Sequence, residues 1–249
     1  MWPPLLVVAL AAVLAITACP PDGLVTADTW AIGCVDLRLT VSADNVTLVV
    51  EGATGAINVT SDAASTTLRL FDSKVTGSIT LGGPHAFADV RRSTGIGADV
   101  IVLAGARNVT IAVVDSTLAG NVVASVLSSA VSASVSITNS TLNATRYAAS
   151  VVGSAIRDVS VTVSDSRLTL AGRDNVGIVA LVAVTMTNAA VNVTSSSITC
   201  KAGNNVGVLG AGSSGGVTWE NVTISAAFTR LTLTVEIMLG SSVPAATTP

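Results

Sequence analysis

The chain has 249 residues and a formal net charge of −3; half of its residues are hydrophobic, 11% are charged and 3% are aromatic. This composition excludes a disordered chain, which has few apolar residues and many charges. It also argues against a nucleic-acid partner, because the chain offers no basic stripe for phosphates and few aromatic rings to stack bases. The length allows one large all-β domain or two smaller domains.

Residues 1–18 are typical of a secretory signal peptide, because an apolar run from Leu5 to Ile16 precedes small residues at Thr17 and Ala18. The run is shorter than the roughly 20 apolar residues of a membrane-spanning helix. We therefore expect cleavage near Ala18 and an extracellular or cell-surface location, although no Lys or Arg precedes the run. The order Ile16-Thr17-Ala18-Cys19 also matches a bacterial lipobox, so a surface lipoprotein acylated at Cys19 is the alternative.

Seven Asn-x-Ser/Thr triplets indicate a secreted or surface glycoprotein from a eukaryote. Composition alone predicts roughly three such triplets. The triplet Asn-Val-Thr also suits the start of a strand, because asparagine favours a turn and the next two residues are β-branched. Both interpretations hold together. The predicted acceptors are Asn45, Asn58, Asn108, Asn139, Asn143, Asn192 and Asn221.

The chain repeats one pattern from residue 45 to residue 239, after a lead-in or N-terminal cap over 19–44 and before a tail over 240–249 that we expect to be disordered. Each repeat has an alternating apolar run, a polar corner that ends in serine, and two further short runs. The last four corner serines are spaced by 24 to 30 residues. The corner serines are Ser73, Ser116, Ser140, Ser166 and Ser196.

Three short strands in each repeat predict an all-β fold, a right-handed parallel β-helix of about seven coils. A β-sandwich is the competing prediction, because its turns recur at a similar spacing. The alternation also predicts which side chains face the core, while Arg167 faces solvent. The inward residues of the stretch 161–170 are Val161, Val163, Leu168 and Leu170.

The three cysteines divide into one core residue and one candidate pair. Cys200 aligns with Leu170 in the repeats and takes an inward position, about six coils from Cys34 and far beyond disulfide reach. If a disulfide forms, Cys19 and Cys34 are its partners, provided that Cys19 is not acylated. We expect no metal site and no cofactor, because His85 is the only histidine.

The repeated corners stack polar residues in one column, about 5 Å apart in successive coils. A pair of carboxylates in such a column could serve glycoside cleavage, so a pectin-lyase-like enzyme acting on polysaccharide is an alternative function. Asp, Asn and Ser also bond nearby backbone in turns, which favours a structural corner over an active or cation-binding site. We assign no catalytic residue. The column reads Asp72, Asp115, Asn139, Asp165 and Ser195.

The segment 82–97, "GGPHAFADVRRSTGIG", stretches the spacing between Ser73 and Ser116 to 43 residues. It is the densest mixture of binding side chains in the chain, and binding residues are often carried on loops over a rigid scaffold. A degenerate coil is the alternative. The candidate binding-loop residues are His85, Phe87, Asp89, Arg91 and Arg92.

The signal peptide, the "NVT" strand entries, the "DS-x-L" corners and the runs "NVGIVAL" and "NVGVLGAG" together resemble the large repetitive surface proteins of kinetoplastid protozoa, of the dispersed gene family type. The similarity covers most of residues 45–239. It implies a glycosylated, adhesin-like β-helix that binds a host or cell-surface glycan or protein. Proteins of that family carry C-terminal membrane segments, so membrane association would depend on a C-terminal region outside this chain.

Overall fold

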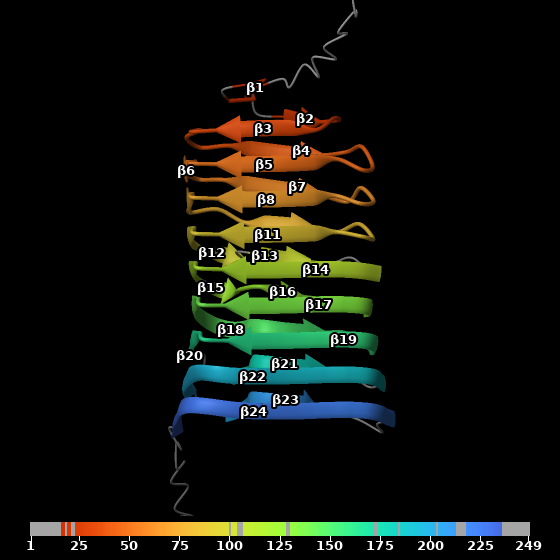
Figure 1. Ribbon diagram of the computed structural model, residues 1–249, viewed down its shortest axis with the longest axis vertical. Coiled ribbons are helices and arrows are strands. Elements are labelled where there is room, and N and C mark those ends of the chain that lie inside the picture. Colours follow the sequence, from red (N-terminus) through yellow and green to blue (C-terminus); the bar gives the residue numbers. More distant parts are fainter. Residues whose placement is uncertain are drawn as a thin grey trace, which may run out of the picture.

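The computed structural model describes residues 16–17, 19–20, 23–99, 101–103, 107–127, 130–171, 174–183, 185–202, 204–212 and 218–235. Every helix or strand in this part of the chain is a β-strand, and successive coils pair in parallel. The near strands run to the left and the far strands to the right as the chain descends in Figure 1, so the β-helix is right-handed. This confirms the predicted fold class and excludes the β-sandwich.

The first sheet lies at the front of Figure 1 and contains one strand from each coil. Its strands are β1 (Ile16–Thr17), β3 (Thr29–Ile32), β5 (Thr47–Glu51), β8 (Thr67–Phe71), β11 (Phe87–Arg91), β14 (Arg107–Val114), β17 (Ala130–Thr138), β19 (Ala155–Ser164), and the first parts of β22 (Thr185–Ala202) and β24 (Thr218–Val235).

Two further sheets complete each coil. The second sheet contains β6 (Thr54–Gly55), β9 (Lys74–Val75), β12 (Thr94–Asp99), β15 (Thr117–Val122), the first part of β18 (Thr141–Val152), β20 (Arg167–Leu170) and the last parts of β22 and β24. The third sheet contains β2 (Gly23–Val25), β4 (Arg38–Val41), β7 (Asn58–Ser61), β10 (Ile79–Leu81), β13 (Ile101–Leu103), β16 (Ser125–Val126), the last part of β18, β21 (Asp174–Val182) and β23 (Asn204–Gly212).

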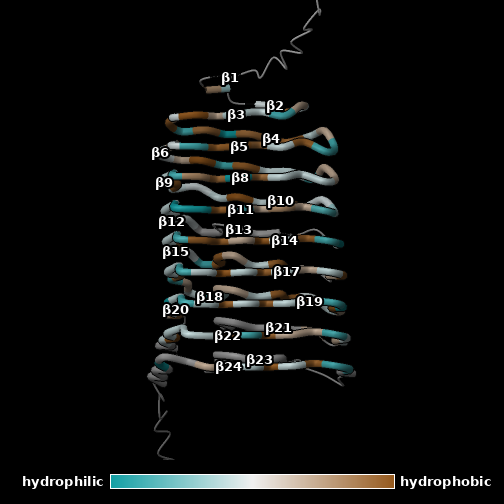
Figure 2. The backbone as a smooth tube through the Cα atoms, in the orientation of Figure 1, coloured by the Kyte–Doolittle hydropathy of each residue, from teal (hydrophilic) through white to brown (hydrophobic). Residues whose placement is uncertain are grey.

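The core follows from the alternation along each strand. Val161, Val163, Leu168 and Leu170 are fully buried and Arg167 is exposed, as predicted. Like residues stack in register, as in the pairs Leu48 with Leu68 and Val161 with Val191. In Figure 2 the hydrophilic residues gather at the two edges of the front sheet, where the chain turns.

The coils lengthen steadily from the N-terminal end to the C-terminal end. Equivalent corner residues are 20 residues apart between Ser73 and Ser93, 24 between Ser116 and Ser140, and 30 between Ser166 and Ser196. The front strand grows from five residues in β8 to ten in β19. The cross-section therefore widens along the axis, and Figure 1 shows the later front strands reaching further to the right.

One predicted boundary needs correction. The lead-in 19–44 already contains coils, because β2 and β3 pair in register with β4 and β5. The segment 82–97 supplies β11, a corner and the start of β12, which confirms the alternative that it is an additional coil and excludes a binding loop. The number of coils is therefore higher than predicted: eight front strands, β5 to β24, follow residue 45.

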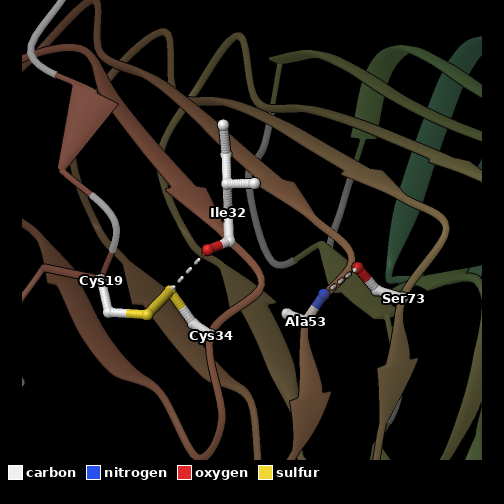
Figure 3. The surroundings of a disulfide bond; sticks show 5 residues. All are labelled: Cys19, Ile32, Cys34, Ala53 and Ser73. Atoms are coloured by element: carbon white, nitrogen blue, oxygen red, sulfur yellow. Dashed lines mark hydrogen bonds between the residues drawn. A yellow bond between two sulfur atoms is a disulfide. The ribbon is translucent and has the colours of Figure 1, made fainter.

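A disulfide joins Cys19 to Cys34 at the N-terminal end, with 5.4 Å between the two Cα atoms (Figure 3). Cys200 pairs in register with Leu170, as the alignment predicted, although its side chain lies outside the described residues. Most of the predicted signal peptide and the whole tail 240–249 also lie outside them. In the described part of the chain, no helix is long and apolar enough to cross a membrane.

Candidate recognition surface

The corner after the first sheet is built by two consecutive residues in each of the six coils from β8 to β22. The first has a left-handed backbone, with φ between 46° and 52° at Asp72, Arg92, Asp115, Asn139, Asp165 and Ser195. The second is a buried serine. The predicted column is confirmed, and the structure adds one member that the sequence pattern missed, the pair Arg92 and Ser93.

The corner serines form a continuous hydrogen-bonded ladder. Each hydroxyl donates to the carbonyl two residues earlier and accepts the backbone N–H of the corner residue one coil before, which is a serine in every case except Ala53. Ser166 shows the pattern: its hydroxyl donates to Ser164 at 2.6 Å and accepts the N–H of Ser140 at 3.1 Å. Figure 3 shows the first rung, from the Ala53 N–H to the Ser73 hydroxyl. Ser166 is therefore a structural link between coils.

The corner carboxylates bond to neighbouring coils. Asp72 receives two hydrogen bonds from the Arg92 guanidinium, at 2.7 and 2.8 Å, and these bonds lower the pKa of Asp72 below its ordinary value. The same contact raises the pKa of Arg92. Asp115 accepts a hydrogen bond of 2.7 Å from the Asn139 carboxamide.

A shallow depression of about 360 Å³ lies along the same column of corners, in the wide coils. It contains the carboxylate of Asp165 and the exposed guanidinium of Arg167. Asp115 and Arg91 do not line it, so the depression does not bring the two candidate carboxylates together. Its lining is Asn139, Ser140, Thr141, Asp165, Ser166, Arg167, Ser195 and Ser197.

The five residues of the expected binding loop lie on three parts of one coil. Phe87, Asp89 and Arg91 take the alternate, outward positions of β11. Arg92 occupies the corner after β11. His85 occupies the opposite corner, where the Asn108 carboxamide lies 3.1 Å from its ring. The structure therefore brings three of the five residues together on a flat sheet and separates His85 from them.

Residues from two earlier coils join these side chains. In register, Asp89 lies beside Arg69, and Arg91 lies beside Phe71, which in turn lies beside Glu51. We call this set the charged and aromatic patch; it comprises Glu51, Arg69, Phe71, Asp72, Phe87, Asp89, Arg91 and Arg92. The sequence analysis missed Glu51, Arg69 and Phe71, which a 20-residue period would have aligned with 87–92.

An ion pair organises the centre of the patch. The guanidinium of Arg91 donates to Asp89 at 2.9 Å, and this bond raises the pKa of Arg91. The Asp89 side chain is only 9% exposed, although it points away from the core. A carboxylate that lies this deep needs such a partner, because burial of an unpaired charge is costly. The carboxylate at the centre of the patch is therefore paired within the fold.

The same outward positions carry no charge in the coils that follow. Beside Phe87, Asp89 and Arg91 of β11, the next strand has Thr110, Ala112 and Val114. On β17 and β19 the residues at these equivalent positions are only Ser and Thr: Ser134, Ser136, Thr138, Ser160, Thr162 and Ser164. We call this second region the hydroxyl face. The exposed residues Val131, Arg157 and Asp158 lie nearer the start of these two strands. At these central positions of the front sheet, charged and aromatic side chains are thus confined to the narrow coils.

The predicted glycan acceptors occupy several faces of the β-helix. All are exposed except Asn58, which is half-buried. Its side-chain amide oxygen accepts the Ser78 N–H at 3.1 Å. Asn139 and Asn221 lie at left-handed corners and donate to the adjacent coil. Asn143 and Asn192 lie on outward positions of strands. Six of the seven predicted acceptors are therefore exposed on the surface of the β-helix.

The described residues contain no group of three His, Cys, Asp or Glu side chains arranged to hold a metal ion. Comparisons with protein families, with curated proteins and with solved structures found no match to this chain.

Proposed function

We propose that the protein is a secreted or cell-surface glycoprotein whose β-helix presents the charged and aromatic patch to a host or cell-surface glycan or protein. The observation that carries the proposal is the gathering of charged and aromatic side chains on the outward face of three consecutive coils, where the later coils have Ser, Thr and Ala. Arginine and aromatic residues are the types most enriched at the energetic centres of interfaces.

The strands of the patch suit recognition because their backbone is fixed by pairing on both sides. β8 pairs with β5 and β11, and β11 pairs with β8 and β14. The Asp89–Arg91 and Asp72–Arg92 pairs fix four of the polar side chains before a partner arrives. Preorganised groups lose less conformational entropy on binding, which favours affinity.

The N-terminal disulfide supports the secretory part of the proposal, because disulfides persist in oxidising compartments. It also bears on the lipoprotein alternative. Acylation of Cys19 and a bond from Cys19 to Cys34 use the same sulfur atom, so a single molecule carries one or the other. Mass analysis of the purified N-terminus distinguishes the two, and enzymatic deglycosylation of protein from a eukaryotic host should produce a mass shift.

Binding to arrays of glycans and surface proteins tests the recognition surface. We expect Arg69→Ala combined with Phe71→Ala to weaken binding at least about tenfold, which corresponds to roughly 1.4 kcal/mol. The matched control combines Ser136→Ala with Thr162→Ala on the hydroxyl face, and it should bind like the original protein. Equal loss in both variants would contradict the assignment of the patch.

Polysaccharide cleavage is a second candidate function, favoured by the depression that holds Asp165 and Arg167 together. Incubation with neutral and acidic glycans, followed by measurement of reducing ends and unsaturated products, tests it. Turnover that is abolished by Asp165→Ala and retained in the patch variant would assign an enzyme to the corner and would replace the recognition proposal.

A further inference from the structure

The first coil, residues 23–37, has large apolar side chains on its outside. Leu24 is 66% exposed, Ile32 is 41% exposed and Val35 is 66% exposed. They are joined by Trp30, which takes an outward, half-buried position on β3. We call these four residues the girdle. Only Val131 and Ile224 are comparable exposed hydrophobic residues elsewhere in the described part of the chain.

The girdle is confined to this one coil. In the next coil Leu24 lies beside Thr40, Ile32 beside Glu51, and Val35 beside Thr54. Three of the four outward columns are therefore apolar at the N-terminal end and polar one coil further along the rod. The fourth residue, Trp30, lies beside Val49, which is buried. A boundary this sharp indicates two different surroundings, because exposed apolar patches mark sites of interaction.

The girdle surrounds the rod and does not lie on one side. Leu24 belongs to the third sheet, Ile32 to the first sheet, and Val35 pairs with the start of the second sheet. A flat protein partner can cover one face of such a ring. The headgroup region of a lipid bilayer covers all of them at once when the end of the rod is immersed in it. Tryptophan is also enriched at this depth of a membrane.

The path of the chain leads to the same end. The apolar run Leu5–Ile16 enters β1, and β1 pairs with Trp30 and Ala31 of the girdle strand. The disulfide joins Cys19 to Cys34, and Cys34 lies between the girdle residues Ile32 and Val35 in the chain. The girdle also lies after the predicted cleavage point near Ala18, so the mature chain retains it.

We propose that the N-terminal end of the β-helix inserts into the interfacial layer of a lipid membrane through the girdle, so that the rod stands away from the bilayer. The interaction is apolar. The only charged residues of the first coil are Asp28 and Asp36, and each accepts a backbone N–H of the following coil at 2.7 Å. Zwitterionic vesicles should therefore suffice, and added salt should leave binding unchanged, in contrast to electrostatic adsorption.

Flotation with phosphatidylcholine vesicles tests the proposal, using the chain as a eukaryotic host secretes it and with its N-terminus determined by mass. The variant Leu24→Thr, Ile32→Thr, Val35→Thr keeps strand-forming residues and removes the apolar surface. We expect it to partition at least about tenfold less into vesicles than the original chain. The matched control, Val131→Thr on β17, should partition normally. No vesicle binding by the original chain would overturn the proposal and would point to a ring-shaped protein partner.

Depth-dependent quenching measures the position of Trp30 in the bilayer, and it can be measured even if the signal peptide remains attached. In a variant with Trp2→Phe and Trp219→Phe, Trp30 is the only tryptophan. Lipids brominated near the headgroup end of the acyl chain should quench Trp30 emission more strongly than lipids brominated near its methyl end. Emission that no brominated lipid quenches would overturn the proposal. Neither measurement depends on the charged and aromatic patch, so the two proposals fail independently.

Discussion

The narrow coils around β8 and β11 and the wide coils around β17 and β19 share one hydrogen-bonding scheme at the corner and differ in coil length and in the chemistry of the central outward positions. Both have the left-handed corner residue and the buried serine. The narrow coils repeat after 20 residues and have charged and aromatic residues on the front; the wide coils repeat after 24 to 30 residues and have Ser and Thr there. The corner therefore sets the pairing between coils, while coil length and outward chemistry vary freely.

We expect the largest effect on stability from substitutions in the core, and this effect should differ between the narrow and wide coils. Leu68 of β8 and Leu168 of β20 are both fully buried. Leu→Ala costs about 2–5 kcal/mol in a core, and the cost is higher where the surroundings cannot collapse into the cavity. We expect Leu68→Ala to reduce the free energy of unfolding in urea more than Leu168→Ala, because a short coil has fewer side chains that can shift. The opposite order would show that the wide coils are the more rigid half.

The serine ladder should give the same effect in both halves. Ser93→Ala and Ser166→Ala each remove a hydroxyl that accepts a buried backbone N–H of the preceding coil. An unsatisfied buried group costs about 1–3 kcal/mol. Urea unfolding of both variants, with the surface variant Thr162→Ala as control, measures this cost. A clear difference between the two ladder variants would show that coil length alters the corner.

The fold could be predicted from the sequence because the corner has a local chemical signature. Asp and Asn tolerate a left-handed backbone, so Asp115-Ser116, Asn139-Ser140 and Asp165-Ser166 could be aligned without a structure. Core positions such as Val161 then followed from the alternation of the flanking strands. The predicted function, secretion and glycosylation are properties that this alignment does not reach, and they stay predictions.

One corner could not be predicted, because Arg92 is not a residue that signals a left-handed backbone, yet its φ is 48°. The inward position that follows is Gly95, where neighbouring coils have Val75 and Leu118. Arg92 also donates two hydrogen bonds to Asp72, which lies one coil away and 20 residues earlier in the chain, so this partner is not visible in the local sequence. The local pattern was therefore lost while the three-dimensional corner was kept, and the missed coil hid the extent of the patch.

Substitutions at Asn139 test how much the corner residue contributes to stability in the wide half. The protein for this test is made without glycans, because Asn139 is a predicted acceptor. Asn139→Ala places a residue with a Cβ at a φ of 46° and removes the bond to Asp115. A left-handed backbone costs such a residue about 1–2 kcal/mol. Asn139→Gly should recover most of that loss, since glycine adopts this φ without strain. Thermal unfolding compares the two variants, and equal destabilisation by alanine and glycine would assign the effect to the lost side-chain bond.

The smallest effect concerns pH and belongs to the narrow half. The pKa of Asp72 is lower in the folded chain than in the unfolded chain because Arg92 donates two hydrogen bonds to it. Such a group stabilises the fold above its unfolded pKa, near 4, and this contribution is lost as pH falls through the lower folded value. We expect the Tm of the original protein to fall more on acidification than that of Asp72→Asn.

Asp165→Asn in the wide half is the matched control, because it also removes a corner carboxylate but breaks no ion pair within the described residues. Because the Asp72–Arg92 pair is exposed, added salt should shrink the difference between the two slopes. Parallel curves for the original protein and Asp72→Asn at low salt would show that the Arg92 corner holds its backbone without help from the ion pair.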